Sequence, residues 1–383
     1  MFSAVVVEAG LAALDRDLVD ATRETGAAVI VIDDGRVRTD WRALGVDAVL
    51  PDALDRNVLL ATLVDCASPL SRPSTAATEP DAGPEPGWRG RLVAVTGAPG
   101  AGRSTVAMAL AEGLARVGPP GSVALADFAL HADQALLHDV GDVVPGVQEL
   151  VESHRRGRPS TDAIRALTFA PAGRDHLVLL GLRRHRDWTV LRPRSVQAAV
   201  DGLMRSFATV VTDVDADFEG DDEVGSLDVE DRNVLARTAC RRADLVIVTA
   251  APTVVGLRRL AVVLDDLRRL GVGPDRVLPL LNRAPRRPRA RAELTAAVAE
   301  LAAAAHPDLA RLTSPVFLPD RRTLDDVVRA GGPLPRSLTQ PLARSVAALL
   351  EQAPIVPAGL DGLEPVPVAP GSLGSWAEQE ATG

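Results

Sequence analysis

Apolar residues in this chain gather in short runs, and segments with helical spacing lie between many of them. From residue 91 onward, seven such runs show no polar alternation, as is typical of strands in a parallel sheet that is covered on both faces. Strands that alternate with helices indicate a doubly wound α/β fold with a mostly parallel sheet. The runs predict a strand that begins at Leu92 and further strands at 123–126, 177–180, 209–212, 245–250, 277–281 and 316–318. The helical spacing predicts helices at 194–206, 257–270, 291–304 and 342–352.

Residues 1–67 repeat this alternation on a smaller scale. The pattern indicates a small parallel α/β unit. Its segment 45–63 resembles the final strand and helix of response-regulator receiver domains, although the unit is too short for five strand-helix pairs. Asp33 and Asp34 follow a strand and are either a phosphorylation site or an ordinary strand-end turn closed by Gly35. The predicted elements are strands at 4–8, 28–32 and 48–50 and helices at 14–25, 40–44 and 55–65.

Composition changes between and after these two domains. Residues 68–90 are rich in Pro, Ser, Thr, Ala and Gly and lack periodicity, so we expect a flexible linker. Residues 354–383 are rich in Pro, Gly and acidic residues, and we expect a disordered tail. The sequence therefore predicts a receiver-like domain at 1–67 and a larger domain at 91–353.

Charge and cysteine content narrow the function classes. The 383-residue chain has a formal net charge of −9, which argues against a dedicated nucleic-acid binder but does not exclude a local basic patch. Cys66 and Cys240 form no C-x-x-C motif, and a reducing cytoplasm is the natural location. No apolar run reaches the roughly 18 residues of a membrane-spanning helix, so we expect no integral membrane segment. Recruitment to a membrane or a cell pole by a partner stays open.

The segment 92–117 carries the clearest chemical motif, an apolar strand followed by a glycine-rich turn and a helix. Residues 97–104 read G-x-x-x-x-G-R-S. Backbone N–H groups of such a loop and the N-terminus of the next helix converge on one anion, which is the geometry of a phosphate-binding loop. Gly100 and Gly102 allow close approach to phosphate, and Ser104 is the expected Mg²⁺ ligand. The alternative is a glycine-rich turn that binds nothing.

Arg103 stands where this motif usually has a lysine. Lysine is a compact ammonium that reaches the β- and γ-phosphates, whereas arginine is a bulky planar fork with a permanent charge. Nucleotide binding can survive this exchange, but stabilisation of a transition state demands closer positioning. We therefore expect binding rather than fast hydrolysis.

Four further stretches resemble the ParA/MinD superfamily of P-loop ATPases, and the resemblance covers roughly residues 91–351. The receiver-like region in front of the larger domain matches the layout of the CpaE/TadZ branch of that superfamily. VALADFALHADQALL at 123–137 is similar to the first switch, FATVVTDVD at 207–215 to the Walker B strand, VLPLLNRA at 277–284 to the adenine-side strand end, and SPVFLPDRRTLDDVVRAGGPL at 314–334 to the closing strand and helix.

The resemblance and the motif together imply a site for ATP and Mg²⁺. Asp127 and Asp213 are the implied catalytic residues, and Ser104 and Asp213 the implied metal ligands, with Asp213 acting through water. Members with activity carry a signature lysine where this chain has Ala98, and a second switch acid where it has Ala129, so hydrolysis is expected to be weak or absent. The implied nucleotide-binding residues are Gly97, Gly100, Gly102, Arg103, Ser104, Thr105, Asn282 and Arg283.

The resemblance implies a cytoplasmic protein for the spatial positioning of pilus-secretion or cell-division machinery, including septum-site determination. It also implies partner proteins in that machinery and a homodimer formed on ATP binding. Two alternatives stay open. One is an active ATPase that cycles between dimer and monomer, as in chromosome partition. The other is a nucleotide-independent scaffold in which Arg103 itself fills the loop.

Other charged and apolar segments carry weaker signals. Residues 213–224 begin like a calcium loop, but Phe218 and Val224 stand where Gly and Glu are required, so we expect a solvated acidic loop. The arginine-rich loop at 283–291 is either a contact for a polyanion or a solvated loop. The histidines show no zinc-binding spacing. Helix 342–352 is amphipathic but carries little positive charge, so we expect it to pack on the domain rather than on a membrane.

Overall fold

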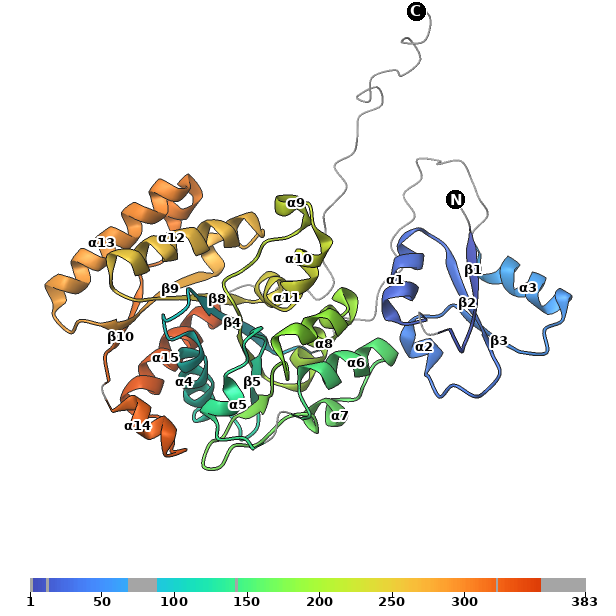
Figure 1. Ribbon diagram of the computed structural model, residues 1–383, viewed down its shortest axis with the longest axis horizontal. Coiled ribbons are helices and arrows are strands. Elements are labelled where there is room, and N and C mark those ends of the chain that lie inside the picture. The colour runs from blue at the N-terminus through green and yellow to red at the C-terminus, as the bar shows by residue number, and fades with distance from the viewer. Residues whose placement is uncertain (1–2, 12–13, 68–87, 142–143, 322, 353–383) are drawn as a thin grey trace, which may run out of the picture.

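The computed structural model describes residues 3–11, 14–67, 88–141, 144–321 and 323–352. These residues form two parallel sheets, one of three strands and one of seven, each accompanied by helices (Figure 1). The predicted tail and all but the last three residues of the predicted linker lie outside the described residues. Within the described ranges, no helix combines the length and the hydrophobicity needed to cross a membrane.

The N-terminal unit is a three-stranded parallel sheet in the order β1-β2-β3. Each of its helices begins after an aspartate, Asp15, Asp40 or Asp55, whose carboxylate accepts a hydrogen bond from a first-turn backbone N–H. The small parallel α/β unit is thus confirmed, and its likeness to a receiver domain stays a prediction. The elements are β1 (Ala4–Glu8), α1 (Arg16–Glu24), β2 (Ala28–Asp33), α2 (Trp41–Leu44), β3 (Ala48–Pro51) and α3 (Arg56–Cys66).

The larger sheet has seven parallel strands in the order β10-β9-β8-β4-β7-β5-β6. The predicted fold class and all seven predicted strands are confirmed. The strands are β4 (Arg91–Gly97), β5 (Val123–Asp127), β6 (Leu177–Leu179), β7 (Thr209–Asp213), β8 (Leu245–Ala250), β9 (Val277–Ala284) and β10 (Val316–Pro319).

Helices cover both faces of this sheet. The four predicted helices correspond to α8, α12, α13 and α15, and the other, mostly shorter, helices complete the layers. The α-helices are α4 (Arg103–Ala115), α5 (Gln134–Leu137), α6 (Val147–Arg156), α7 (Thr161–Arg165), α8 (Pro193–Ser206), α9 (Asp221–Val224), α10 (Leu227–Arg232), α11 (Val234–Arg242), α12 (Val254–Arg269), α13 (Pro288–Ala305), α14 (Leu324–Arg329) and α15 (Arg336–Gln352). The described residues also form the 3₁₀ helices η1 (His185–Val190), η2 (Pro274–Arg276) and η3 (Pro307–Arg311).

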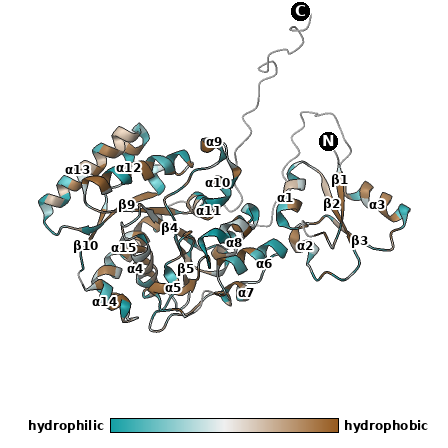
Figure 2. Ribbon diagram, viewed as in Figure 1, coloured by the Kyte–Doolittle hydropathy of each residue, from teal (hydrophilic) through white to brown (hydrophobic). Residues whose placement is uncertain are grey.

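Two apolar cores hold the large unit together. One joins the sheet to α8, α11 and α12, and the other joins it to α4 and α15. Every residue of α4 from Val106 to Ala115 is buried, and all of them except Glu112 are apolar residues or glycine, as expected of a helix that is covered on nearly all sides. Figure 2 shows hydrophobic residues along the strands and on one side of surface helices such as α12. The rigid core therefore fixes the start of α4, where the phosphate-binding motif lies.

Helix α15 packs against α4, which confirms the prediction that it packs on the domain. Leu342 and Val346 are fully buried in the contact. The helix begins at Arg336 rather than at residue 342, because it continues through Pro341. Proline has no N–H to bond the carbonyl four residues earlier, and that carbonyl, of Ser337, accepts a hydrogen bond from Arg321 at 3.4 Å instead.

The small unit touches the large one through α1, which lies against α6 and α8 (Figure 1). The carboxylate of Asp17 accepts hydrogen bonds from the backbone N–H of Arg194 at 3.1 Å and from the Ser195 hydroxyl at 2.9 Å. Arg194 also pairs with Glu24 through two nitrogens. These contacts are polar, and the apolar cores of the two units stay separate. The predicted division into two domains joined by a flexible linker stays a prediction.

Candidate functional site

The glycine-rich loop joins β4 to α4 at the carboxyl ends of the central strands. Gly102 has a φ of 86°, and a Cβ there would lie 2.3 Å from Asn282 Nδ2, so a larger residue does not fit. This glycine is the N-cap of α4, and no side chain caps that end of the helix. First-turn N–H groups lack intrahelical partners, so an uncapped N-terminus next to a glycine-rich loop is suited to bind an anion.

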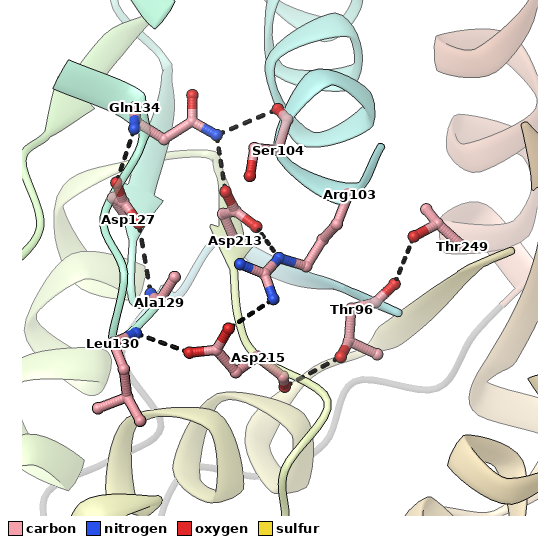
Figure 3. A network of polar contacts seen from close by, with 10 residues as sticks. All are labelled: Thr96, Arg103, Ser104, Asp127, Ala129, Leu130, Gln134, Asp213, Asp215 and Thr249. Carbon is pink, nitrogen blue, oxygen red and sulfur yellow. Dashed lines mark hydrogen bonds and ion pairs between the residues drawn. The ribbon is translucent and has the colours of Figure 1, made fainter. Parts of the chain in front are cut away.

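Arg103, the first residue of α4, points into a cluster of acids. We call Asp127, Asp213 and Asp215 the acid cluster. Arg103 Nε donates to Asp213 Oδ1 at 2.6 Å, and Nη1 donates to Asp215 Oδ1 at 2.7 Å (Figure 3). Burial lowers the pKa of Arg103, but the two carboxylates outweigh burial and the pKa is raised overall. The guanidinium is therefore a fixed cation in this cluster.

Asp213 is fully buried at the end of β7, and its second oxygen is also engaged. Oδ2 accepts a hydrogen bond from Gln134 Nε2 at 2.8 Å, and the same nitrogen donates to the backbone oxygen of Ser104 at 3.1 Å (Figure 3). Gln134 itself is fully buried in the first turn of α5. It ties the predicted Walker B residue to the start of α4.

Asp127 ends β5 and is the strand partner of Asp213. Its side chain is fully buried, and its two oxygens accept backbone N–H groups of Gln134 at 2.8 Å and Ala129 at 3.3 Å. Burial raises the pKa of Asp127 well above its usual range, and the nearby charge of Asp213 raises it further. In this arrangement Asp127 holds the loop that leads to Gln134. Its predicted catalytic role stays a prediction.

The prediction of a solvated acidic loop at 213–224 is wrong for Asp215, because this residue is bound by other parts of the protein. Besides Arg103, it binds the backbone N–H of Leu130 through Oδ2 at 2.7 Å, and its carbonyl accepts the hydroxyl of Thr96 at 3.0 Å. Its neighbour Asp217 pairs with Arg232 at 2.6 Å. The loop lacks the residues of a calcium site, but Asp215 and Asp217 both have protein partners. The partner of Asp215, Arg103, lies 112 residues away in the sequence.

Asn282 and Arg283 lie on the other side of the first turn of α4. Asn282 Nδ2 donates to the backbone oxygen of Ala101 at 2.9 Å, and so ties the end of β9 to the loop. A cavity of about 190 Å³ opens here, lined in part by Thr105, Asn282, Arg283, Pro319 and Asp320. The structure thus brings the predicted adenine-side residues next to the predicted phosphate loop.

A second cavity, of about 300 Å³, lies on the side of the acid cluster. Arg103 and Asp215 line it together with Pro99, His131 and Arg232. The site therefore has two openings, one beside Asn282 and one beside Arg103. Sequence reasoning missed the part played by Gln134, whose only signal was its place inside the switch-like stretch 123–137.

The donor set fits phosphate better than it fits magnesium. The uncapped start of α4 and the glycine-rich loop suit phosphate groups. Mg²⁺ requires oxygen ligands, usually with one or two carboxylates, but both oxygens of Asp213 already accept protein hydrogen bonds. Across the described residues, no group of three or more His, Cys, Asp or Glu side chains could hold a metal ion. The metal-binding roles predicted for Ser104 and Asp213 therefore stay predictions.

No protein-family model matches the chain, and no curated protein matches it in sequence. Solved structures do match it in shape. The ParA family ATPase from Chlorobium tepidum TLS is 12% identical, with a TM-score of 0.53, over 67% of this chain and 98% of that one. The cell division ATPase MinD from Pyrococcus furiosus is 17% identical, with a TM-score of 0.48, over 69% of this chain and 99% of that one.

The septum site-determining protein MinD from Pyrococcus horikoshii OT3, complexed with Mg-ADP, is 17% identical, with a TM-score of 0.47, over 68% of this chain and 95% of that one. The similarity to the Chlorobium tepidum protein, at 12% identity, establishes the fold alone. The larger unit of this chain therefore has the α/β P-loop NTPase-like fold of a ParA family ATPase.

Proposed function

We propose that this chain is an ATP-binding protein of the ParA/MinD superfamily, similar to the CpaE/TadZ branch, with weak or absent hydrolysis. Its role is the spatial positioning of pilus-secretion or cell-division machinery in the cytoplasm. The fold shared with a ParA family ATPase and the four superfamily-like stretches support this proposal. Partner proteins of that machinery recruit it to a membrane or cell pole, and ATP binding favours a homodimer.

The observation that carries nucleotide binding is the open start of α4. Gly102 gives it an uncapped N-terminus, and the loop between β4 and α4 leaves room for phosphate at Gly100, where a Cβ would meet no neighbour within 4 Å. The cavity beside Asn282 and Arg283 then receives the base. In this arrangement the phosphate groups lie at the start of α4, and the base lies in the adjacent cavity.

Weak hydrolysis follows from how the other groups are engaged. Ala98 supplies no cation, and Arg103 already binds two acids. Asp127 is buried, has a raised pKa, and accepts two backbone N–H groups, which leaves it poorly placed to orient a water molecule. Each group that would act on the transition state is absent or committed elsewhere.

One rival function draws on the same cluster. In a nucleotide-independent scaffold, Arg103 replaces the charge that a ligand would bring, and the fold serves as an interaction surface. The paired state of Arg103 and Asp213 favours this rival over an active ATPase that cycles in chromosome partition. Binding measurements separate the scaffold from the nucleotide-binding protein.

Equilibrium binding of fluorescent ATP, ADP and GTP analogues to the full chain tests the proposal. We expect ATP and ADP to bind and to raise the melting temperature, since a ligand in hundredfold excess over its Kd stabilises the native state by about 2.7 kcal/mol. Gly102→Val should abolish binding because its side chain enters the space of Asn282. Arg289→Lys, at an exposed ion pair in the first turn of α13, is the control for general effects. A native chain that binds none of the three nucleotides would favour the scaffold.

A further inference from the structure

Every carboxylate oxygen of the acid cluster is already held by a protein donor. Each of the two oxygens of Asp127, Asp213 and Asp215 accepts a hydrogen bond from a protein donor. The donors come from four separate places: the side chain of Arg103, the amide of Gln134, and two stretches of switch backbone (Figure 3). Each oxygen keeps a second lone pair, so a cation here would compete with these donors for carboxylates that the protein already engages.

The charge at the centre of the cluster is already supplied. The guanidinium of Arg103 lies between Asp213 and Asp215, with its side chain only 14% exposed and that of Asp213 not exposed at all. A divalent cation at Asp213 would face this fixed positive charge at short range and in a poorly screened environment. It would also compete with the hydrogen bonds that Arg103 and Gln134 donate to the oxygens of Asp213.

Arg103 keeps donors for an anion. A guanidinium has five N–H groups, and two of its nitrogens, Nε and Nη1, bind the acids. The same side chain lines the cavity of about 300 Å³ that Pro99 and Arg232 also border, so that this side of the loop is accessible to a ligand. Arginine therefore neutralises the acids on one edge and can meet phosphate oxygens on the other.

We infer that Arg103 takes the place of the divalent cation, so that this site binds the phosphate groups of a metal-free nucleoside di- or triphosphate without Mg²⁺. The inference rests on the proposed function, since it concerns the same phosphate-binding loop. Gln134 has a positioning role, because it holds the second oxygen of Asp213 and so completes the exclusion of metal.

The test compares the Kd of fluorescent ADP and ATP analogues for the full chain in EDTA and in millimolar Mg²⁺. For the native sequence we expect the two values to agree within about threefold, less than 1 kcal/mol. In Arg103→Lys combined with Gln134→Ala, a point charge replaces the fork and an oxygen of Asp213 is released, so Mg²⁺ should tighten binding by about tenfold or more. Gln134→Ala alone, which keeps Arg103, provides a milder variant if the double one fails to fold.

Arg289→Lys is the matched control, since it makes the same chemical change at an exposed pair with Glu293 and should leave the ratio of the two Kd values unchanged. Native protein that binds nucleotide at least tenfold more tightly with Mg²⁺ would overturn this inference and leave the proposed function intact. Native protein that binds nucleotide in neither buffer would overturn both. These two failures are therefore distinct.

Discussion

Two arginines in this chain each bind carboxylates through two nitrogens, but water reaches them to very different extents. The side chains of Arg103 and Asp213 are 14% and 0% exposed, whereas those of Arg194 and Glu24 are 27% and 67% exposed. Charges attract strongly in a buried setting and weakly where water and salt screen them. The same chemistry therefore makes a fixed internal cation at the start of α4 and a weak joint between the two units.

The largest effect expected from this contrast is on hydrolysis. Loss of one preorganised donor slows a reaction by about 10²- to 10³-fold, and losses within one site do not multiply. With Ala98 in place of lysine and Arg103 held by acids, phosphate release from ATP should stay below about one per minute. Steady-state phosphate release checks this. Faster turnover that is lost in Arg103→Ala would mean that Arg103 leaves its acids and acts on the γ-phosphate.

The next effect is on stability. Arg103→Ala leaves Asp213 buried without its cation, and breaking a buried pair in this way costs about 3–5 kcal/mol of unfolding free energy. Urea denaturation near neutral pH measures the loss. Arg289→Ala, at a pair with 93% and 66% exposed side chains, should change stability by no more than about 0.5 kcal/mol. Equal losses in the two variants would remove the distinction between the buried and the exposed pair.

Acidic pH should lower the unfolding free energy through two buried histidines, His138, which lies next to Gln134, and its neighbour His176. Burial lowers the pKa of His138 to about 4, and burial together with His138 lowers that of His176 to about 3. The Nε2 atoms of the two rings lie 3.0 Å apart, and His138 Nδ1 lies 2.8 Å from the carbonyl oxygen of Gln134. In the unfolded chain both histidines titrate near 6.5, so between about pH 6.5 and 4 the unfolded state binds protons that the folded state does not.

Unfolding free energy should therefore fall as pH falls through that window, by at most about 1.4 kcal/mol per pH unit for each histidine. Urea denaturation at about pH 7.5 and 5.5 measures the dependence. The variant His138→Gln with His176→Asn should show a shallower dependence, since its side chains do not titrate. An unchanged slope would assign the acid sensitivity to other groups.

The smallest effect is expected at the exposed pair between the units. A double-mutant cycle of Arg194→Ala and Glu24→Ala should give a coupling of about 0.2–1 kcal/mol, because solvent-exposed ion pairs contribute little. Added salt should reduce it further. A coupling above about 2 kcal/mol would indicate that the two units are joined as firmly as the acid cluster is.

The sequence predicted the large sheet well because its strands are buried on both faces. Apolar runs such as 92–95 and 245–248 fit a parallel sheet that is covered on both faces. Short helices such as α5 and α7 span only one turn and carry no measurable period, so they were not predicted. Helix α15 was predicted to begin too late because its carbonyl at Ser337 finds a partner that the local sequence does not reveal.

The sequence predicted the phosphate-binding loop of the candidate site, but it did not predict the contacts that Arg103 and Gln134 make with the acid cluster. The spacing of the residues from Gly97 to Ser104 identifies the loop in the sequence, because a phosphate-binding loop is formed by neighbouring residues. The contacts of Arg103 with Asp213 and Asp215 span more than a hundred residues, and only the parallel arrangement of β4 and β7 brings them together. Gln134 sits on a four-residue helix placed by Asp127, and nothing in its immediate sequence marks it as a partner of Asp213.

The hydrogen bond from Asn282 to Ala101 makes the phosphate loop and the end of β9 one mechanical part. Asn282 also fills the space next to Gly102, so the loop cannot move toward Asn282. Arg283 follows directly, with a φ of 55°, and opens the exposed arginine-rich segment that leads into α13. A ligand that shifts the phosphate-binding loop should therefore also shift this basic segment. Hydrogen exchange at the start of α13 should report whether the loop after β4 is occupied.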